Sequence, residues 1–349
     1  MSPYVFTLLI FNLGLGTTMT FASSHWLLAW MGLEINTLAI IPLMTRQHHP
    51  RAVEATTKYF LTQATAAALI LFASTSNAWL TGEWAINQMS HPLATSTIML
   101  ALALKLGLAP VHFWMPEVIQ GLDLTTGLVL STWQKLAPFA LLLQVSSTVN
   151  PLILTLIGLL STLIGGWGGL NQTQLRKILA YSSIAHLGWM VLIIQFSPPL
   201  ATLSLLIYVI MTTSAFLTFK LTSSTTMNAL ATSWTKSPMM TSLATLILLS
   251  LAGLPPLTGF MPKWLILQEL VKQDLPMLAF FAAMTALLSL YFYLRLCYTV
   301  ALTSSPNTIT MLTPWRLNPT QTSPLNPLTT MLTLALLPLT PAILALVIY

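Results

Sequence analysis

Charged residues are scarce in this sequence. Only 6% of the 349 residues are charged, 13 basic and 7 acidic, whereas 55% are hydrophobic. Soluble domains carry about 25% charged residues, and a soluble fold needs a polar surface that twenty charged side chains cannot supply. The composition therefore excludes soluble enzymes and nucleic-acid-binding proteins, and it predicts an all-α integral membrane protein with many spans.

Groups that could bind metals or nucleotides are equally rare. Cys297 is the only cysteine, which excludes an internal disulfide, and no Cys/His cluster has the spacing of a zinc or iron–sulfur site. Neither of the glycine-rich phosphate-binding motifs, GxGxxG and GxxxxGK[ST], occurs. The sequence therefore predicts no metal, nucleotide or redox cofactor in this chain.

Long apolar runs predict about eleven membrane spans, because a transmembrane helix needs about 20 mostly apolar residues. The expected helices cover 3–22, 25–45, 58–80, 93–120, 125–146, 150–170, 175–196, 199–220, 239–271, 276–302 and 327–348. The longest polar stretches are 221–238 and 303–326, and the second is rich in proline. We expect that second stretch to be an irregular surface loop.

Eleven crossings sort the basic residues unequally between the two sides of the membrane. One side receives Arg46, Arg51, Lys58, Arg176, Lys177, Lys220, Lys236 and Arg316, and the other receives only Lys272. The positive-inside rule predicts that the basic side faces the cytoplasm or the mitochondrial matrix. The N-terminus is then expected on the basic side and the C-terminus on the opposite side.

An internal repeat marks two of the expected helices as discontinuous. Gly107–Glu117 reads GLAPVHFWMPE and Gly253–Lys263 reads GLPPLTGFMPK, and the two align without a gap at an offset of 146 residues. Proline removes a backbone donor and disrupts the preceding helical turn, so breaks are expected within 93–120 and 239–271. Paired interruptions of this kind point to the ion pathway of a transporter; the alternative is that the prolines serve packing alone.

The spacing of the repeat also predicts the organisation of the chain. The two interrupted helices are the fourth and the ninth, five spans apart, so equivalent helices run in opposite directions across the membrane. This arrangement predicts an inverted repeat of two five-helix units over residues 1–146 and 150–302. A loop and a C-terminal helix over residues 303–349 complete the chain.

Four ionisable residues are expected near the middle of the membrane: Glu34, Lys105, Lys135 and Lys263. A charge at that depth costs at least about 2.5–3.5 kcal/mol. Desolvation favours the neutral forms of lysine and glutamate, and a nearby opposite charge favours the charged forms. A lysine whose carboxylate partner comes and goes can therefore act as a proton switch. The alternative is a static ion pair that fixes helix packing.

Three further candidates for a proton path are His112, Glu117 and His186. Histidine relays protons well near neutral pH, although a buried histidine can equally be a hydrogen-bonded packing residue. Glu117 is the repeat counterpart of Lys263, and it is either a path residue or a helix-end group near the interface. Arg295 lies near the basic end of its helix and is expected to extend toward the interface.

These residues and motifs resemble a known family. The pattern of one glutamate and three lysines, with the segments LKLGLAPVHFWMPEV, LAYSSIAHLGWM and LAGLPPLTGFMPKW, resembles the antiporter-like membrane subunits of respiratory NADH–quinone oxidoreductase (complex I). The resemblance covers essentially the whole chain and is strongest to mitochondrial versions from vertebrates. The family usually has fourteen helices, and the chain looks like an animal version that lacks the first three.

The resemblance implies a proton-translocating subunit, coupled to quinone reduction elsewhere in the complex. Glu34, Lys105, Lys135 and Lys263 match the positions of the family's hydrophilic axis, with His112 and His186 as companions. It implies the mitochondrial inner membrane, with the N-terminus in the matrix and the C-terminus in the intermembrane space. Lipids and other membrane-arm subunits would be the partners, and FMN, iron–sulfur clusters and ubiquinone would sit in other subunits. The alternatives are a free-standing cation/proton antiporter and a structural spacer subunit.

Overall fold

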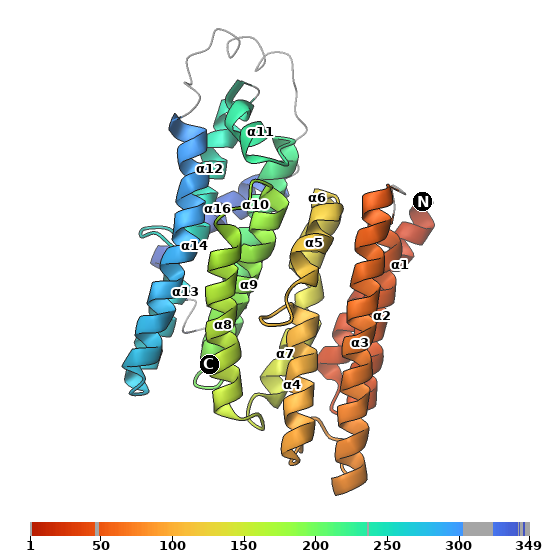
Figure 1. The fold of residues 1–349 in the computed structure, drawn as a ribbon. Helices are drawn as coiled ribbons and strands as arrows, with labels where there is room; N and C mark the ends of the chain where they lie inside the picture. The colour runs from red at the N-terminus through yellow and green to blue at the C-terminus, as the bar shows by residue number, and fades with distance from the viewer. Residues whose placement is uncertain are drawn as a thin grey trace. The chain divides into compact units, whose positions relative to one another are not determined.

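The computed structural model describes residues 2–45, 49–235, 237–302 and 324–340, together with Ala342 and Ala345. Every regular element in these ranges is a helix, and no strand occurs in them (Figure 1). The chain divides into two compact units, Met1–Ser161 and Thr162–Tyr349. The expected all-α fold is therefore confirmed.

The first unit is a bundle in which α2 contacts both α1 and α3, while α4 packs against α3 and α7. Its helices are α1 (Pro3–Ala22), α2 (Trp26–Met44), α3 (Pro50–Thr81), α4 (Pro92–Leu106), α5 (Trp114–Gly121), α6 (Leu124–Ser131), α7 (Trp133–Val145) and the first part of α8 (Pro151–Gly169). Proline occupies the first turn of α1, α3 and α4, where its missing N–H costs nothing.

Helix α3 starts eight residues before the expected position 58. The ring of His49 accepts a hydrogen bond from the N–H of Arg51 at 3.2 Å, which caps the helix just before Pro50. Arg51, which precedes the expected helix, therefore lies within α3, and Lys58 lies in its third turn and not at its start. The first two turns of α3 are polar, so a prediction based on runs of apolar residues starts the helix too late.

The second unit is arranged around α10, which packs against α9, α12, α13 and α16. Its elements are the rest of α8, α9 (Leu175–Ile193), α10 (Pro198–Leu221), α11 (Met227–Ala231), η1 (Thr232–Thr235), α12 (Pro238–Ala252), α13 (Phe260–Lys272), α14 (Pro276–Leu302), α16 (Leu325–Ala335) and η3 (Leu337–Leu339). The polar stretch 221–238 thus contains α11 and a 3₁₀ turn. The expected loop at 303–326 lies almost wholly outside the described residues.

The last expected helix, over 327–348, is not continuous. Helix α16 ends at Ala335 and is followed by the 3₁₀ turn η3. Pro338 falls in that turn and cannot donate the backbone hydrogen bond that would continue the helix. The prediction of one unbroken helix over this range is therefore wrong, and most of 341–348 lies outside the described residues.

The outer surface of the helices is apolar. Helix α1 buries only Leu9, Leu13 and a few small residues, while Tyr4, Leu8 and Phe11 are exposed. Seven helical segments of the described chain are long and apolar enough to cross a membrane, with α6 and α7 counted together as one segment, Leu124–Val145. Helices α4 and α12, with 15 residues each, are about 22 Å long and too short to cross a core of about 30 Å alone. The exact number of eleven spans stays a prediction.

Candidate functional site

The first break lies between α4 and α5, and Gly107 ends α4. Its φ of 77° falls in the left-handed region, and its N–H bonds to the carbonyls of Ala103 and Leu104. The indole N–H of Trp114 donates to the Leu104 carbonyl at 2.9 Å. Carbonyls freed by the break are thus bonded within the protein, as the membrane interior requires, and Lys105 is fixed in the last turn of α4.

The second break lies between α12 and α13, and Gly253 ends α12 with a φ of 79°. Lys263, in the first turn of α13, turns back so that its Nζ donates to the carbonyl oxygen of Ala252 at 2.8 Å. A Cβ on Gly253 would lie 3.0 Å from both Cδ and Nζ of Lys263. The glycine therefore makes room for this lysine as well as for the turn.

The two breaks share one backbone design. Gly107 and Gly253 occupy equivalent positions of the sequence repeat and have nearly the same left-handed φ. Each break also holds a cis peptide bond before proline, at Ala109–Pro110 and Pro255–Pro256. The discontinuous helices expected within 93–120 and 239–271 are confirmed, whereas the inverted repeat of units 1–146 and 150–302 stays a prediction.

Lys105 is buried in the first unit, with only 6% of its surface exposed. Its Nζ has no hydrogen-bond partner among the described residues. Lys105 and Lys135 line the same cavity, in which about 20 Å³ is open to the centre of a water molecule. The structure therefore brings together two of the predicted lysines, one from α4 and one from α7.

Glu34 lies beside this cavity on α2. The Thr37 hydroxyl donates to its Oε2 at 3.0 Å, and Thr37 itself lines the cavity. The charge of Glu34 acts on Lys105 and on the buried Tyr59. No ion pair joins Glu34 directly to Lys105 in the described part of the chain. The glutamate and the lysine are thus neighbours without direct contact.

Lys135 owes its position to an interruption that the sequence did not predict. The helix expected over 125–146 is divided, because Thr132 has φ −111° and ψ −70° between α6 and α7. Lys135 lies in the first turn of α7 with 3% of its surface exposed. Thr132 is neither proline nor glycine, and the nearest proline, Pro138, lies six residues later inside α7, so the sequence does not mark the position of this break.

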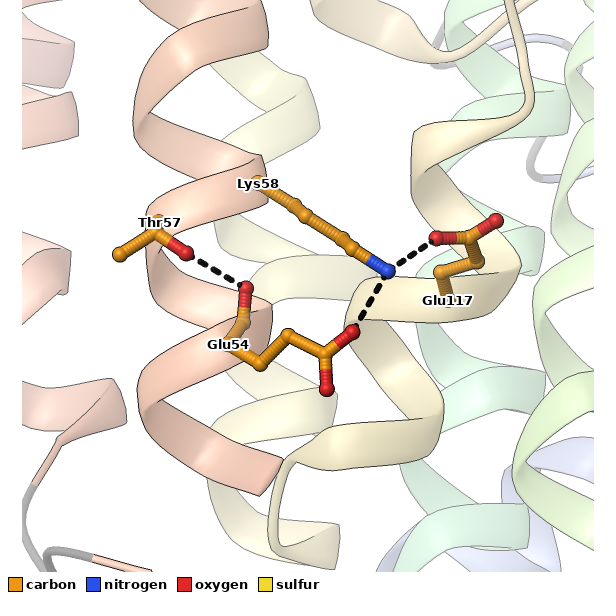
Figure 2. Close-up of polar contacts among 4 residues, drawn as sticks. All are labelled: Glu54, Thr57, Lys58 and Glu117. Atoms are coloured by element: carbon orange, nitrogen blue, oxygen red, sulfur yellow. Dashed lines mark hydrogen bonds and ion pairs between the residues drawn. The ribbon is translucent and has the colours of Figure 1, made fainter. Parts of the chain in front are cut away.

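Glu117 does not line the cavity of Lys105. Figure 2 shows its carboxylate paired with Lys58, which also pairs with Glu54, and the two distances are 2.7 and 2.8 Å. All three side chains are about half exposed. This network joins α3 to α5, so the geometry favours the helix-end interpretation of Glu117.

The two histidines have different surroundings. His112 is buried in the first break, where its Nδ1 lies 3.2 Å from the carbonyl oxygen of Pro110. His186 lies on α9 with its ring 5.7 Å from that of Tyr208. With Lys263 and Tyr293 it lines a smaller cavity of the second unit, with about 10 Å³ open to a water centre. His186 therefore shares a cavity with one of the predicted lysines, Lys263.

Arg295 does not extend toward the interface as expected. Its guanidinium donates to the carbonyls of Leu170 and Gln172, in the turn that follows α8. Carbonyls at a helix C-terminus carry partial negative charge and lack intrahelical partners. Arg295 is therefore a cap that ties α14 to the end of α8.

Neutral polar residues near the lysines were missed by the search for charges. Asn36 and Gln63 line the cavity of Lys105, and Tyr208 and Tyr293 are buried around His186 and Lys263. An amide or a phenol within an otherwise apolar helix is the sequence feature that could have identified these residues. No group of three His, Cys, Asp or Glu in the described ranges could hold a metal ion.

Comparisons with known proteins agree with this geometry. Residues 23–289 match the family model described as NADH:quinone oxidoreductase/Mrp antiporter, TM, and residues 290–344 match NADH dehydrogenase subunit 2 C-terminus. The chain is 74% identical to NADH-ubiquinone oxidoreductase chain 2 of Oncorhynchus mykiss over 99% of both chains. It is 69% identical to the chain of that name in Carassius auratus, again over 99% of both.

Solved structures show the same fold. A chain in respiratory complex I from Thermus thermophilus matches with a TM-score of 0.86 and 32% identity, over 99% of this chain and 80% of that one. A chain of the Mrp complex from Dietzia sp. matches with a TM-score of 0.75 and 19% identity, over 84% and 60% of the two chains, which shows the fold alone. On these similarities the chain belongs to the antiporter-like NADH:quinone oxidoreductase family, and within it to the NADH-ubiquinone oxidoreductase chain 2 proteins.

Proposed function

We propose that the chain translocates protons as a membrane-arm subunit of NADH:ubiquinone oxidoreductase. Its full-length similarity to chain 2 proteins supports this assignment. The membrane is then the mitochondrial inner membrane, with the N-terminus in the matrix and the C-terminus in the intermembrane space. Neighbouring subunits and lipids cover the apolar faces, and FMN, iron–sulfur clusters and ubiquinone belong to other subunits.

The observation that carries the proposal is the surroundings of Lys105. A buried polar group without a partner is costly, and the described residues give this ammonium none. A lysine that served packing alone would be paired or replaced by an apolar residue. The position instead suits a group that gains and loses a proton as its surroundings change.

Glu34 provides the change of surroundings. An approach of its carboxylate favours the charged form of Lys105, and a retreat favours the neutral form. The present geometry, with Glu34 in electrostatic reach but not in contact, corresponds to the separated state. Quinone reduction elsewhere would drive the alternation, and Lys135 at the same cavity would exchange protons with Lys105.

The second unit holds a lysine of its own, Lys263, beside His186 and Tyr293. A histidine and a small polar cavity are suited to passing protons to and from a buried amine. We assign Lys263 and His186 to the proton path of this unit. His112 and Glu117 have local partners in the first unit, so they rank below these two.

Of the two alternatives, the free-standing antiporter is not favoured. The chains with 69–74% identity are named as oxidoreductase subunits, whereas the similarity to the Mrp complex is at 19% identity. The spacer alternative differs in what the buried charges do, and variants of these residues can test it.

The test is proton pumping by the intact complex, purified with a variant of this chain and reconstituted into vesicles. Lys105→Met and Lys263→Met should each assemble but lower the pumping rate by about 10²-fold or more, the range that one positioned acid or base contributes. Lys272→Met is the control, because Lys272 is exposed and its ion pair within the described residues is with Glu269, at 3.4 Å. If both buried-lysine variants keep the native proton yield per NADH, the assigned path is wrong.

A further inference from the structure

Three neighbouring polar side chains of the first unit are buried and have polar atoms without hydrogen-bond partners in the described residues. They are Asn36 on α2, Gln63 on α3 and Lys105 on α4, and each has 6% or less of its surface exposed. The Nδ2 and Oδ1 of Asn36, the Nε2 of Gln63 and the Nζ of Lys105 have no partner in the described residues. Because buried polar groups are almost always satisfied by protein or ordered water, this grouping calls for a ligand.

All three residues line a single cavity. About 20 Å³ of it is open to the centre of a water molecule, and a buried water needs about 10–15 Å³ by the same measure and two to four polar partners. Tyr59 and Gln134 also line it. The cavity therefore has the size and the polar lining for one water molecule, and it is too small for a larger ligand.

Thr37 connects this cavity to Glu34. Its side chain is buried, lines the cavity, and donates to Oε2 of Glu34 at 3.0 Å. Its single O–H can point instead to the backbone carbonyl oxygen of Glu34, which lies 2.9 Å away. A hydroxyl has one donor and two acceptor positions. While Thr37 donates to the carboxylate, its oxygen can accept a hydrogen bond from the cavity side.

We propose that one water molecule, held by Asn36, Gln63 and Lys105, joins the Thr37 hydroxyl to relay protons between Lys105 and Glu34. This inference rests on the proposed function and names the connection that it needs, because the two ionisable groups make no direct contact. The Lys105 ammonium gives a proton to the water, the water gives one of its own to Thr37, and Thr37 gives its proton to the carboxylate. The amine and the carboxyl end neutral, and the water and the hydroxyl are unchanged.

Thr37→Val in the intact complex tests the relay, since valine keeps the shape and removes the hydroxyl. The pumping rate should fall by about 10-fold to 100-fold, the range for a misplaced reacting group. Thr37→Ser should restore it. The matched control is Thr56→Val, because Thr56 is also buried and its hydroxyl donates to the backbone carbonyl of Val53, at 2.8 Å.

The outcomes separate the relay from the proposed function. If Lys105→Met blocks pumping while Thr37→Val pumps like Thr56→Val, the relay is wrong and the role of Lys105 stands. If Thr37→Ser pumps as poorly as Thr37→Val, the hydroxyl is not the active group and the relay is also wrong. Native pumping by Lys105→Met would overturn the proposed function itself.

The water can be observed directly. A density map of the complex that resolves other buried waters should show a peak within hydrogen-bond distance of Lys105 Nζ and the Gln63 amide. Gln63→Met should remove or displace this peak and slow pumping. Asn77→Leu is the control, because Asn77 is a buried amide of the same helix, bonded to the Glu83 carbonyl at 3.3 Å and away from the cavity lining. A native map with no peak there would overturn the proposal.

Discussion

The two broken helices share a backbone conformation but hold their lysines differently. Lys105 precedes Gly107, and its Nζ has no hydrogen-bond partner in the described chain. Lys263 follows Gly253 and donates to the Ala252 carbonyl at the end of α12. Both lysines lie beside the C-terminal end of a helix, which favours a cation. The second lysine donates a hydrogen bond to a carbonyl there, whereas the first makes no such bond and depends on water and on a nearby carboxylate.

The distribution of acidic residues matches this difference. The acidic residues of the stretch 162–349 are Glu269 and Asp274. Both lie near the C-terminal end of α13, where Glu269 pairs with Lys272. In the first unit, Glu34 lies within electrostatic reach of Lys105. We infer from this comparison that a nearby carboxylate controls the lysine of the first unit, whereas a hydrogen bond to a backbone carbonyl positions the lysine of the second.

The largest effect should come from Gly253→Ala. An L residue in the left-handed region costs about 1–2 kcal/mol, and the new Cβ would also press on Cδ and Nζ of Lys263 at 3.0 Å. Gly82→Ala is the matched control, because Gly82 has a φ of 77° and the new methyl group would meet no atom within 4 Å apart from its own neighbours in the chain. The amount of assembled complex on a native gel should fall far more for Gly253→Ala; equal losses would refute the fit of Lys263 against this glycine.

Arg295→Leu should have the next largest effect. It would leave the carbonyls of Leu170 and Gln172 without their cation. Both residues are partly exposed, so the cost for each stays below the value of about 1–3 kcal/mol for a fully buried group. Arg295→Lys keeps the charge and should restore part of the loss. Thermal unfolding of the membrane arm gives the measurement, and an unchanged midpoint for Arg295→Leu would show that the second unit does not depend on cations at helix-end carbonyls.

Lys263→Met and Lys105→Met should differ in stability. Lys263→Met leaves the Ala252 carbonyl unpaired, which costs about 1–3 kcal/mol. Lys105→Met removes a buried, unpartnered ammonium and should be neutral or stabilising. Both should lose pumping. Identical melting temperatures for the two variants would remove the proposed distinction between the two breaks.

Glu117→Gln should have the smallest effect. Glu117 is the repeat counterpart of Lys263 but lies half exposed in a network with Lys58 and Glu54 (Figure 2). Exposed ion pairs contribute little, so the pumping rate should change by less than about twofold. A loss as large as that of Lys263→Met would place Glu117 on the proton path after all.

Much of the fold was predictable because proline, glycine and long apolar runs constrain the chain locally. The breaks after Gly107 and Gly253 follow from the repeat, and α1 matches its predicted bounds of 3–22. The early start of α3 depends on the cap by His49, and the division at Thr132 has no local signature. These two features depend on contacts of individual residues, and the mean hydropathy of a segment contains no information about such contacts.

The site was predictable only in its charged members. Glu34, Lys105, Lys135 and Lys263 stand out because a charge is costly in an apolar span. Asn36, Thr37 and Gln63 are uncharged, so hydropathy does not single them out. Their position around one cavity identifies them as candidates. Likewise, the role of Arg295 depends on carbonyls more than 120 residues earlier in the chain.

The central claim is that the buried charges of the first unit move protons and do not merely hold the helices together. The most direct test is the proton yield per NADH of the complex with Glu34→Leu and Lys105→Met together. This apolar pair should pack and assemble while pumping remains lost, because neither a proton donor nor an acceptor is left. Recovery of the native proton yield in this double variant would contradict the claim and support the spacer alternative.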